Sequence, residues 1–168
     1  MSCLVELNDA AADAVRPRLL ALTASPDWAD ALLAARPFKD LDALLAASDD
    51  IIASLDESQV DAALAGHPRI GERASHLDDE SAARSATEQA GMAQATTAVK
   101  DAMARANAAY EQRFGRIYLV AAAGRSAEDL LSLLRARLRN DPESELDVVR
   151  GELARISRLR LSDSWEDE

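Results

Sequence analysis

The segment GHPRIGE, residues 66–72, separates two parts of a chain that otherwise has the pattern of helix almost throughout. Pro68 has no backbone N–H and disfavours the helical conformation of the residue before it, so we expect His67 in a turn or an extended conformation. Gly66 is typical of the position just past the end of a helix. Because histidine changes charge near neutral pH and the chain holds only 2 of them, His67 is the first candidate for chemistry.

Helix-start and helix-end signals extend from this segment toward the N-terminus. They predict a first helix that is capped by Asn8 or Asp9, reaches Leu22 and is broken or kinked at Pro17. A second helix has Ser25 as N-cap and Pro26 at its first position and ends near Pro37. A third helix starts at Asp40, and a short fourth one is opened by a capping box of Asp56 and Gln59. The last of these helices ends at Gly66, where the GHPRIGE segment begins.

Toward the C-terminus the signals predict a loop, further helices and a tail. A polar loop over residues 73–83 comes first, followed by a helix from Arg84 to Phe114 that Gly91 can divide and Gly115 ends. Two further helices follow, one capped by Ser126 and one opened by Asp141 and Pro142, and a frayed acidic tail covers residues 162–168. The apolar run IYLVAAA, residues 117–123, fits a buried strand or a buried helix, and we favour a helix because the chain shows no partner strand. The sum is one compact all-α domain over residues 1–168, a bundle of about seven to nine helices of ordinary length.

The charge of the chain restricts its partners. It has 30 acidic side chains against 19 Lys and Arg, a net charge of −11, and the arginines are spread along the chain. Nucleic acids and anionic membranes need a positive surface, so we expect neither as a partner. The N-terminus lacks a basic region followed by an apolar run, no apolar stretch approaches the roughly 20 residues of a bilayer span, and Cys3 is the single cysteine. These features favour a soluble cytoplasmic protein.

A second group of polar residues, Ser85, Glu88 and Gln89, falls on one face of a helix through its i, i+3, i+4 spacing. A hydroxyl, a carboxylate and an amide together offer hydrogen-bond donors and acceptors to a small molecule. The alternative is a capping box of Ser85 and Glu88 at the start of a surface helix. For His67 the alternative is a histidine that caps a carbonyl group within a turn.

A metal site built from His67, Glu72 and His76 is disfavoured. The chain offers no further histidine and a single cysteine, whereas zinc sites take three or four protein ligands, mostly His or Cys. We therefore expect no metal at His67.

Two further patterns stay open on periodicity alone. Arg160 continues the apolar stripe of the last predicted helix, and its guanidinium is either an anion-binding group or the solvated end of a side chain whose stem packs on the core. Asn107, Tyr110 and Phe114 share one helical stripe that leads into Gly115. Tyr110 and Phe114 are most simply core residues, while the Phe-Gly junction after the helix leaves backbone N–H groups that a ligand could use.

Taken together, these motifs resemble the 2-oxo-4-hydroxy-4-carboxy-5-ureidoimidazoline (OHCU) decarboxylases of urate breakdown. The motifs, in order, are W…RPF within PDWADALLAARPF (26–38), HPRIGE (67–72), S-x-x-EQ (85–89), N-x-x-Y-x-x-x-FG (107–115) followed by the apolar run and GRS (124–126), and I-x-x-x-RL (156–161). The resemblance covers the chain from about Trp28 to Leu161, and the order and spacing of HPRIGE and the EQ pair are its most specific part.

The resemblance implies an all-α homodimer, without metal or organic cofactor, that releases CO2 from OHCU and gives (S)-allantoin. By position it makes His67 the catalytic acid/base and Glu88 the acidic partner that orients it. The substrate-binding positions that it implies are Pro68, Ser85, Gln89, Gly115, Ile117, Tyr118, Leu119 and Arg160.

The chain departs from the family pattern after Phe114. FGRIYL (114–119) stands where the family commonly has FG followed by an aromatic residue, Pro, Phe and Ile. This departure motivates a second hypothesis, a non-catalytic helical binding module with the same fold. A third, a helix-turn-helix regulator suggested by the break at Ala90 and Gly91, is opposed by the acidic charge.

Overall fold

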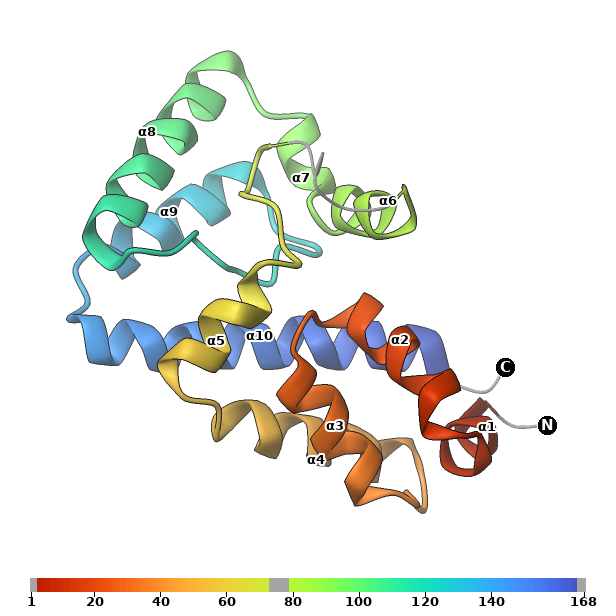
Figure 1. Cartoon of the computed structure of the whole chain (residues 1–168). Coiled ribbons are helices and arrows are strands. Elements are labelled where there is room, and N and C mark those ends of the chain that lie inside the picture. The colour runs from red at the N-terminus through yellow and green to blue at the C-terminus, as the bar shows by residue number, and fades with distance from the viewer. Residues whose placement is uncertain (1–2, 73–78, 166–168) are drawn as a thin grey trace. The chain divides into compact units, whose positions relative to one another are not determined.

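The computed structural model describes residues 3–72 and 79–165, and in these ranges the chain forms ten α-helices and no strand (Figure 1). In chain order the helices are α1 (Cys3–Asp9), α2 (Ala12–Leu22), α3 (Pro26–Ala35), α4 (Leu41–Ala53), α5 (Glu57–Leu64), α6 (Asp79–Glu88), α7 (Ala90–Ala93), α8 (Thr97–Phe114), α9 (Ala127–Arg137) and α10 (Pro142–Trp165). The all-α prediction is confirmed. Among these ten, no helix combines the length and the hydropathy of a membrane span.

The chain packs as two compact units. The terminal unit comprises the residues up to Gly66 together with those from Arg150 onward, and the central unit comprises residues 67–149. Helices α1 to α5 belong to the terminal unit and α6 to α9 to the central unit, whereas α10 begins in the central unit and continues in the terminal unit. His67 is thus the first residue of the central unit.

Three helix starts of the terminal unit, those of α3, α4 and α5, follow the predicted caps. Ser25 Oγ accepts a hydrogen bond from the Trp28 N–H at 3.2 Å, and Asp40 caps α4 in the same way at 2.8 Å. Asp56 and Gln59 form the capping box of α5 through two bonds of 2.8 Å. Because these side chains satisfy N–H groups that have no partner within the helix, they fix where each helix begins.

The predicted first helix corresponds to α2, which begins at Ala12 with Ala11 as its N-cap, so the cap predicted at Asn8 or Asp9 is wrong. Helix α1, which ends at Asp9, was not predicted and adds one helix to the expected number. Arg36 Nη1 donates to the carbonyl oxygens of Leu7 at 3.0 Å and Ala10 at 2.9 Å, near the end of α1. These bonds satisfy carbonyl groups that a continuing helix would use internally. The predicted break at Pro17 is wrong, since α2 continues through it and buries an apolar face that outweighs the one backbone hydrogen bond that proline removes.

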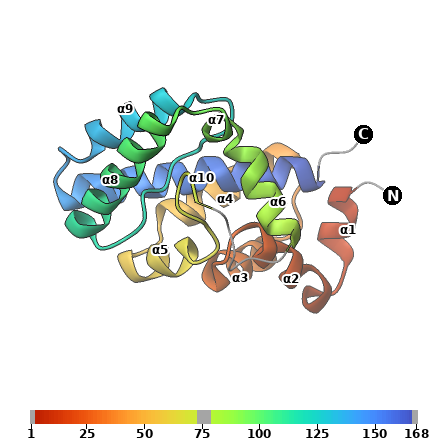
Figure 2. The ribbon, with the colours of Figure 1, turned by 90° about the horizontal axis from the view of Figure 1, so that it is seen from above.

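The central unit is built around α8 and α9, which lie side by side (Figures 1 and 2). Its buried apolar cluster consists of Ile70, Met92, Met103, Tyr110, Phe114, Tyr118, Val120, Ala122, Ala127, Leu130, Leu131 and Leu134. The Tyr110 ring centroid lies 4.7 Å from that of Phe114 and 5.5 Å from that of Tyr118. Ile70 anchors the HPRIGE segment in this core, and the stripe of Tyr110 and Phe114 is core as the sequence suggested.

The run IYLVAAA is buried as predicted, but the favoured helix is wrong: it forms an irregular connection between α8 and α9. Its backbone carbonyls find donors in arginine side chains. Arg137 Nη1 donates to the Leu119 oxygen at 2.6 Å, and Arg125 Nε donates to the Ala121 oxygen at 3.1 Å. Buried backbone groups need hydrogen-bond partners but not a regular element, so these side-chain donors permit an irregular path.

The long helix predicted from Arg84 to Phe114 is divided into α6, α7 and α8, in line with the weak point at Gly91. Thr96 opens α8 by accepting from a backbone N–H at 3.3 Å, and Gly115 ends it in the left-handed conformation at φ 73°. Three helices in place of one add two to the number of described helices, and the absence of the helix expected over residues 117–123 removes one.

The polar loop predicted over residues 73–83 is wrong for residues 79–83, which form the first half of α6. Residues 73–78 lie outside the described ranges. Alanines within α6 and an i, i+4 pair of Arg84 with Glu80, 3.5 Å apart, support helix in a stretch whose polarity suggested a loop.

The backbone around Gly91 explains why α7 carries a glycine. A Cβ built at Gly91 would overlap the carbonyl oxygen of Arg125. We therefore expect Gly91→Ala to lower the free energy of unfolding by about 1–3 kcal/mol, because two backbone segments must move apart. The control is Gly151→Ala in α10, where the built Cβ meets no atom within 4 Å and a gain of roughly 0.5–1 kcal/mol is expected. Urea unfolding followed by circular dichroism measures both, and equal effects would contradict the expectation.

The acidic tail does not fray where the sequence predicted it to begin. Helix α10 continues through Trp165, whose side chain is 1% exposed and lies under the Arg18 guanidinium at 5.0 Å. Burial of this indole offsets the cost of ordering the polar residues before it. The prediction is wrong for residues 162–165, and residues 166–168 lie outside the described ranges.

Candidate active site

The HPRIGE segment leaves the helical conformation at His67, as predicted. The His67 side chain is buried, with 6% exposure. The Glu72 N–H donates to the Arg69 carbonyl at 3.1 Å, which closes a turn. Gly71 within that turn has φ 88°, a conformation that glycine adopts without strain. The segment therefore combines a buried imidazole with a sharp turn that follows it.

Gln89 connects this turn to the end of α6. Its Oε1 accepts a hydrogen bond from the Gly71 N–H at 2.9 Å. Because a backbone N–H needs an acceptor, the bond fixes the orientation of the amide and leaves the two donors of Nε2 for other partners. Two sequence motifs that the resemblance paired are thus in direct contact.

A pocket of about 240 Å³ lies beside this contact. Its lining residues are Pro68, Glu72, Ala82, Ala83, Ser85, Ala86 and Gln89. Three predicted site residues, Pro68, Ser85 and Gln89, therefore line the same pocket.

Among the polar residues that line the pocket, Ser85 has the most informative environment. It is 3% exposed, and its Oγ has no hydrogen-bond partner among the described residues. A buried hydroxyl without a partner costs about 1–3 kcal/mol, so such groups tend to persist where a ligand supplies the partner. The capping-box alternative is wrong, because α6 begins at Asp79 and Ser85 lies in its second turn.

Glu88 and His67 are each next in sequence to a residue that lines the pocket. Glu88 is half-buried near the end of α6, next to Gln89, and His67 directly precedes Pro68. Both belong to the central unit. The pairing of imidazole and carboxylate stays a prediction.

Gly115, Ile117, Tyr118 and Leu119 are not among the residues that line this pocket. The Gly115 N–H donates to the Glu111 carbonyl at 2.8 Å, which closes the end of α8. The Tyr118 hydroxyl donates to the Leu130 carbonyl at 3.0 Å from a buried ring. The backbone groups that the sequence assigned to the substrate are in part engaged in the fold.

Arg160 belongs to the terminal unit. It is 4% exposed, and its Nη1 donates to the Leu22 carbonyl at 2.6 Å. The interpretation of a guanidinium that reaches water is therefore wrong, because the head group is buried and hydrogen-bonded.

In the part of the chain that the structure describes, no three His, Cys, Asp or Glu side chains are grouped as metal ligands. His76, one member of the disfavoured metal set, lies outside the described residues. The polar groups identified at the pocket are a hydroxyl, an amide and the Glu72 carboxylate, a set suited to hydrogen bonding with an organic ligand.

An all-helical chain with a buried histidine ahead of a hydrogen-bonded turn, and with a small, mostly apolar pocket that holds a few polar groups, is typical of helical proteins with a small-molecule site. Comparison of the sequence with protein families identifies the family: the OHCU decarboxylase model matches residues 8–162. The chain belongs to the OHCU decarboxylase family.

Individual relatives agree with this assignment. The chain is 31% identical over 143 residues to the OHCU decarboxylase of Amia calva, spanning 79% of that protein, and 32% identical over 139 residues to that of Mus musculus, spanning 78%. It is 29% identical to the uric acid degradation bifunctional protein TTL of Arabidopsis thaliana over 147 residues, 86% of this chain. The chain spans 45% of TTL and 33% of the bifunctional protein PucL of Bacillus subtilis, so it is much shorter than either.

Solved structures share the fold. A crystal structure of OHCU decarboxylase in the presence of (S)-allantoin superposes with a TM-score of 0.76 at 22% identity, over 89% of this chain and 98% of that one. A crystal structure of (S)-allantoin synthase gives a TM-score of 0.72 at 19% identity, over 98% of this chain and 54% of that one.

Sequence reasoning missed two residues that contact the HPRIGE segment, Asn107 and Glu111 of α8. Asn107 donates to the Ile70 carbonyl at 3.0 Å, and Glu111 forms an ion pair with Arg69. Their i, i+4 spacing places them on one helical face, which is a usable signal, but Asn107 was given no role beyond its place in the N-x-x-Y-x-x-x-FG motif, and Glu111 was one acidic residue among 30.

Proposed function

We propose that this chain catalyses the decarboxylation of OHCU to (S)-allantoin in urate breakdown. Membership of the family over residues 8–162 supports the proposal, as do the relatives from Amia calva and Mus musculus named for this activity. The structural observation that carries it is the hydrogen bond between Gly71 and Gln89, which holds Pro68, Ser85 and Gln89 at one compact pocket.

The chemistry suits the residues. OHCU carries a carboxylate and a hydroxyl on a carbon next to a ring C=N bond, so the electrons of the breaking C–C bond flow into that C=N without an organic cofactor. His67, as a neutral imidazole, accepts the hydroxyl proton while CO2 leaves. Glu88 fixes the tautomer of His67 and stabilises the imidazolium, as the acid of a catalytic triad does.

A proton must then reach one face of the planar intermediate, and this step sets the configuration of allantoin. Ser85 Oγ and the free donors of Gln89 Nε2 hold the ring or ureido edge of the substrate, which presents that face. Roles for Gly115, Ile117, Tyr118, Leu119 and Arg160 in substrate binding stay predictions from the family resemblance.

The direct test gives the protein freshly generated OHCU and records both its disappearance and the circular dichroism of the product. We expect faster loss of OHCU than in buffer and allantoin of the S configuration, because a protein-bound intermediate is protonated on one face. Racemic product formed at the spontaneous rate would contradict the proposal.

The same measurement decides the alternative of a non-catalytic binding module, which would bind allantoin-like ligands and leave the decay of OHCU unchanged. The departure FGRIYL that motivated this alternative has a structural explanation at Tyr118, which packs against Tyr110 and bonds Leu130 in the core.

We further propose, from the resemblance, a cytoplasmic homodimer that needs neither metal nor organic cofactor. Light scattering measures the oligomeric state, and dialysis against EDTA before the assay tests the independence from metal.

A further inference from the structure

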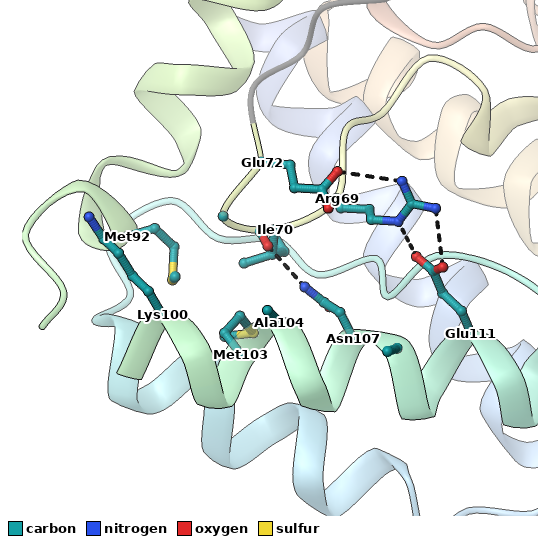
Figure 3. A pocket seen from close by; sticks show the side chains of 11 residues that line it. Arg69, Ile70, Glu72, Met92, Lys100, Met103, Ala104, Asn107 and Glu111 are labelled. Carbon is teal, nitrogen blue, oxygen red and sulfur yellow. Dashed lines mark hydrogen bonds and ion pairs between the residues drawn. The ribbon is translucent and has the colours of Figure 1, made fainter. Parts of the chain in front are cut away.

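The face of α8 beneath the HPRIGE segment holds that segment at two points (Figure 3). Asn107 Nδ2 donates to the Ile70 carbonyl at 3.0 Å. One turn further along the helix, the Glu111 carboxylate receives two hydrogen bonds from the Arg69 guanidinium, one from Nε to Oε1 and one of 3.1 Å from Nη2 to Oε2. Glu72 lies on the third side of the guanidinium, 3.4 Å from Nη1.

With the bond from Gly71 to Gln89, three successive residues are each held by a different side chain: Arg69 by Glu111, Ile70 by Asn107 and Gly71 by Gln89. A turn with a glycine at φ 88° has little rigidity of its own. The path of the backbone before Gly71, including His67, therefore depends on these three contacts.

We propose that Glu111 and Asn107 are positioning residues for His67, acting through Arg69 and Ile70. Pro68 is the only residue between His67 and Arg69, and its ring fixes φ, so a displacement of Arg69 is passed to the imidazole rather than absorbed. This inference rests on the proposed function, in which His67 moves the proton.

Burial separates this role from simple stabilisation of the fold. The side chains of Arg69 and Glu111 are 45% and 27% exposed, and an ion pair that reaches solvent contributes little to global stability. The ion pair instead fixes the position of Arg69, because two parallel hydrogen bonds set both the distance between guanidinium and carboxylate and the plane in which the two groups lie. Loss of the pair therefore leaves the helices intact and allows His67 to move.

The test is Glu111→Gln, assayed well below its unfolding temperature. We expect kcat to fall by about 10- to 100-fold, since a catalytic group displaced by about 1 Å can cost that much, while KM changes less than about threefold. The charge-reversed double variant Arg69→Glu with Glu111→Arg restores the pair and is expected to recover most of kcat, whereas each single reversal is not.

The matched control is Asp30→Asn. Arg16 and Asp30 form the same kind of two-bond ion pair, at 2.6 and 3.2 Å, with side chains 39% and 57% exposed, but they belong to the terminal unit and do not contact the HPRIGE segment through this pair. We expect this variant to keep the wild-type kcat. An equal loss in both variants, or an unchanged kcat in Glu111→Gln, would overturn the proposal.

Amide hydrogen exchange gives a readout that does not depend on activity. The Gly71 N–H, protected by Gln89, is expected to exchange faster in Glu111→Gln than in the wild type, while amides within α9 stay unchanged. If the wild type leaves OHCU decay unaltered, the proposed function fails, and exchange still decides whether Glu111 orders the turn. Unchanged protection of Gly71 would refute the positioning role.

Discussion

Replacing His67 by alanine is expected to lower the enzymatic rate of OHCU decarboxylation by about 10²–10⁴, the usual loss when a general base is removed. The product should approach racemic allantoin, because spontaneous decay then supplies most of it. His67 is buried but lies outside the helices, so the far-ultraviolet circular dichroism spectrum should keep its helical form. Reaction kinetics and product dichroism, recorded on the same sample, check both expectations.

Added imidazole provides the control for this experiment. If His67 acts by moving a proton, free imidazole that enters the cavity left by the side chain should restore part of the rate, and the restoration should follow the neutral form of imidazole as pH changes. Full, stereoselective activity in His67→Ala would remove His67 from the mechanism. Loss of activity together with loss of helical signal would assign it a structural role instead.

The second large effect concerns the buried ion pair of Arg137 and Glu145 in the central unit. Glu145→Ala is expected to lower the free energy of unfolding by about 3–5 kcal/mol, because it leaves the Arg137 charge buried without its partner. The two side chains are 8% and 0% exposed, and Arg137 Nη2 lies 2.6 Å from Glu145 Oε1. Urea unfolding monitored by circular dichroism measures the loss.

The environment of Glu145 supports the size of this effect. Its carboxylate also accepts hydrogen bonds from the Tyr110 hydroxyl at 2.6 Å and from Asn140 Nδ2 at 2.9 Å. Burial, together with the adjacent Glu145 carboxylate, raises the pKa of Tyr110 above its ordinary value, so the phenol stays a donor. Removing one carboxylate therefore leaves several donors without an acceptor.

Two comparisons make the stability prediction specific. Asp49→Ala removes the exposed pair with Arg158, whose side chains are 37% and 45% exposed, and should cost no more than about 1 kcal/mol. Replacing Arg137 and Glu145 together by Met and Leu should recover part of the loss, because no buried charge then remains, although Tyr110, Asn140 and the Leu119 carbonyl still lose their partners. If Glu145→Ala were as mild as Asp49→Ala, the cluster would be a minor contributor to stability.

Five helix starts could be predicted from the sequence because a cap is a local interaction, whereas the cap predicted at Asn8 or Asp9 was wrong. Ser25, Asp40, Asp56 and Ser126 each bond an N–H within three residues, and all four were identified from spacing alone. Asp141 opens α10 in the same way through the Ser144 N–H at 2.9 Å.

Tertiary contacts decided the elements that the sequence predicted wrongly. The irregular path of residues 117–123 depends on Arg125 and on Arg137, the latter from the far end of α9. The order of α10 beyond Leu161 depends on burial of Trp165. The bond from Arg137 and the contact between Arg18 and Trp165 join residues far apart in the sequence, so local propensity alone predicted the wrong structure in both places.

The residues of the candidate site also fall into two groups, those that the sequence predicted and those that it did not. His67, Pro68, Ser85 and Gln89 carried signals in their own motifs, and the resemblance supplied the link between them. The bond from Gly71 to Gln89 joins two motifs through backbone and could not be inferred from residue types. The contacts from α8 were missed for the same reason, since Asn107 bonds the Ile70 backbone and Glu111 pairs with the Arg69 side chain, and neither contact involves a ligand.

The arginine-bonded connection between α8 and α9 also bears on solubility. IYLVAAA is uncharged, apolar and free of proline, the composition of segments that stack into amyloid-like sheets when they are exposed. In the folded chain most of its side chains are buried, and its Leu119 and Ala121 oxygens already accept from guanidinium groups, so these carbonyls are not presented to an incoming strand. Arg116 and Arg125 flank the run and place charge at both ends, as gatekeeper residues do. Folding of the central unit thus keeps its most aggregation-prone segment away from other chains.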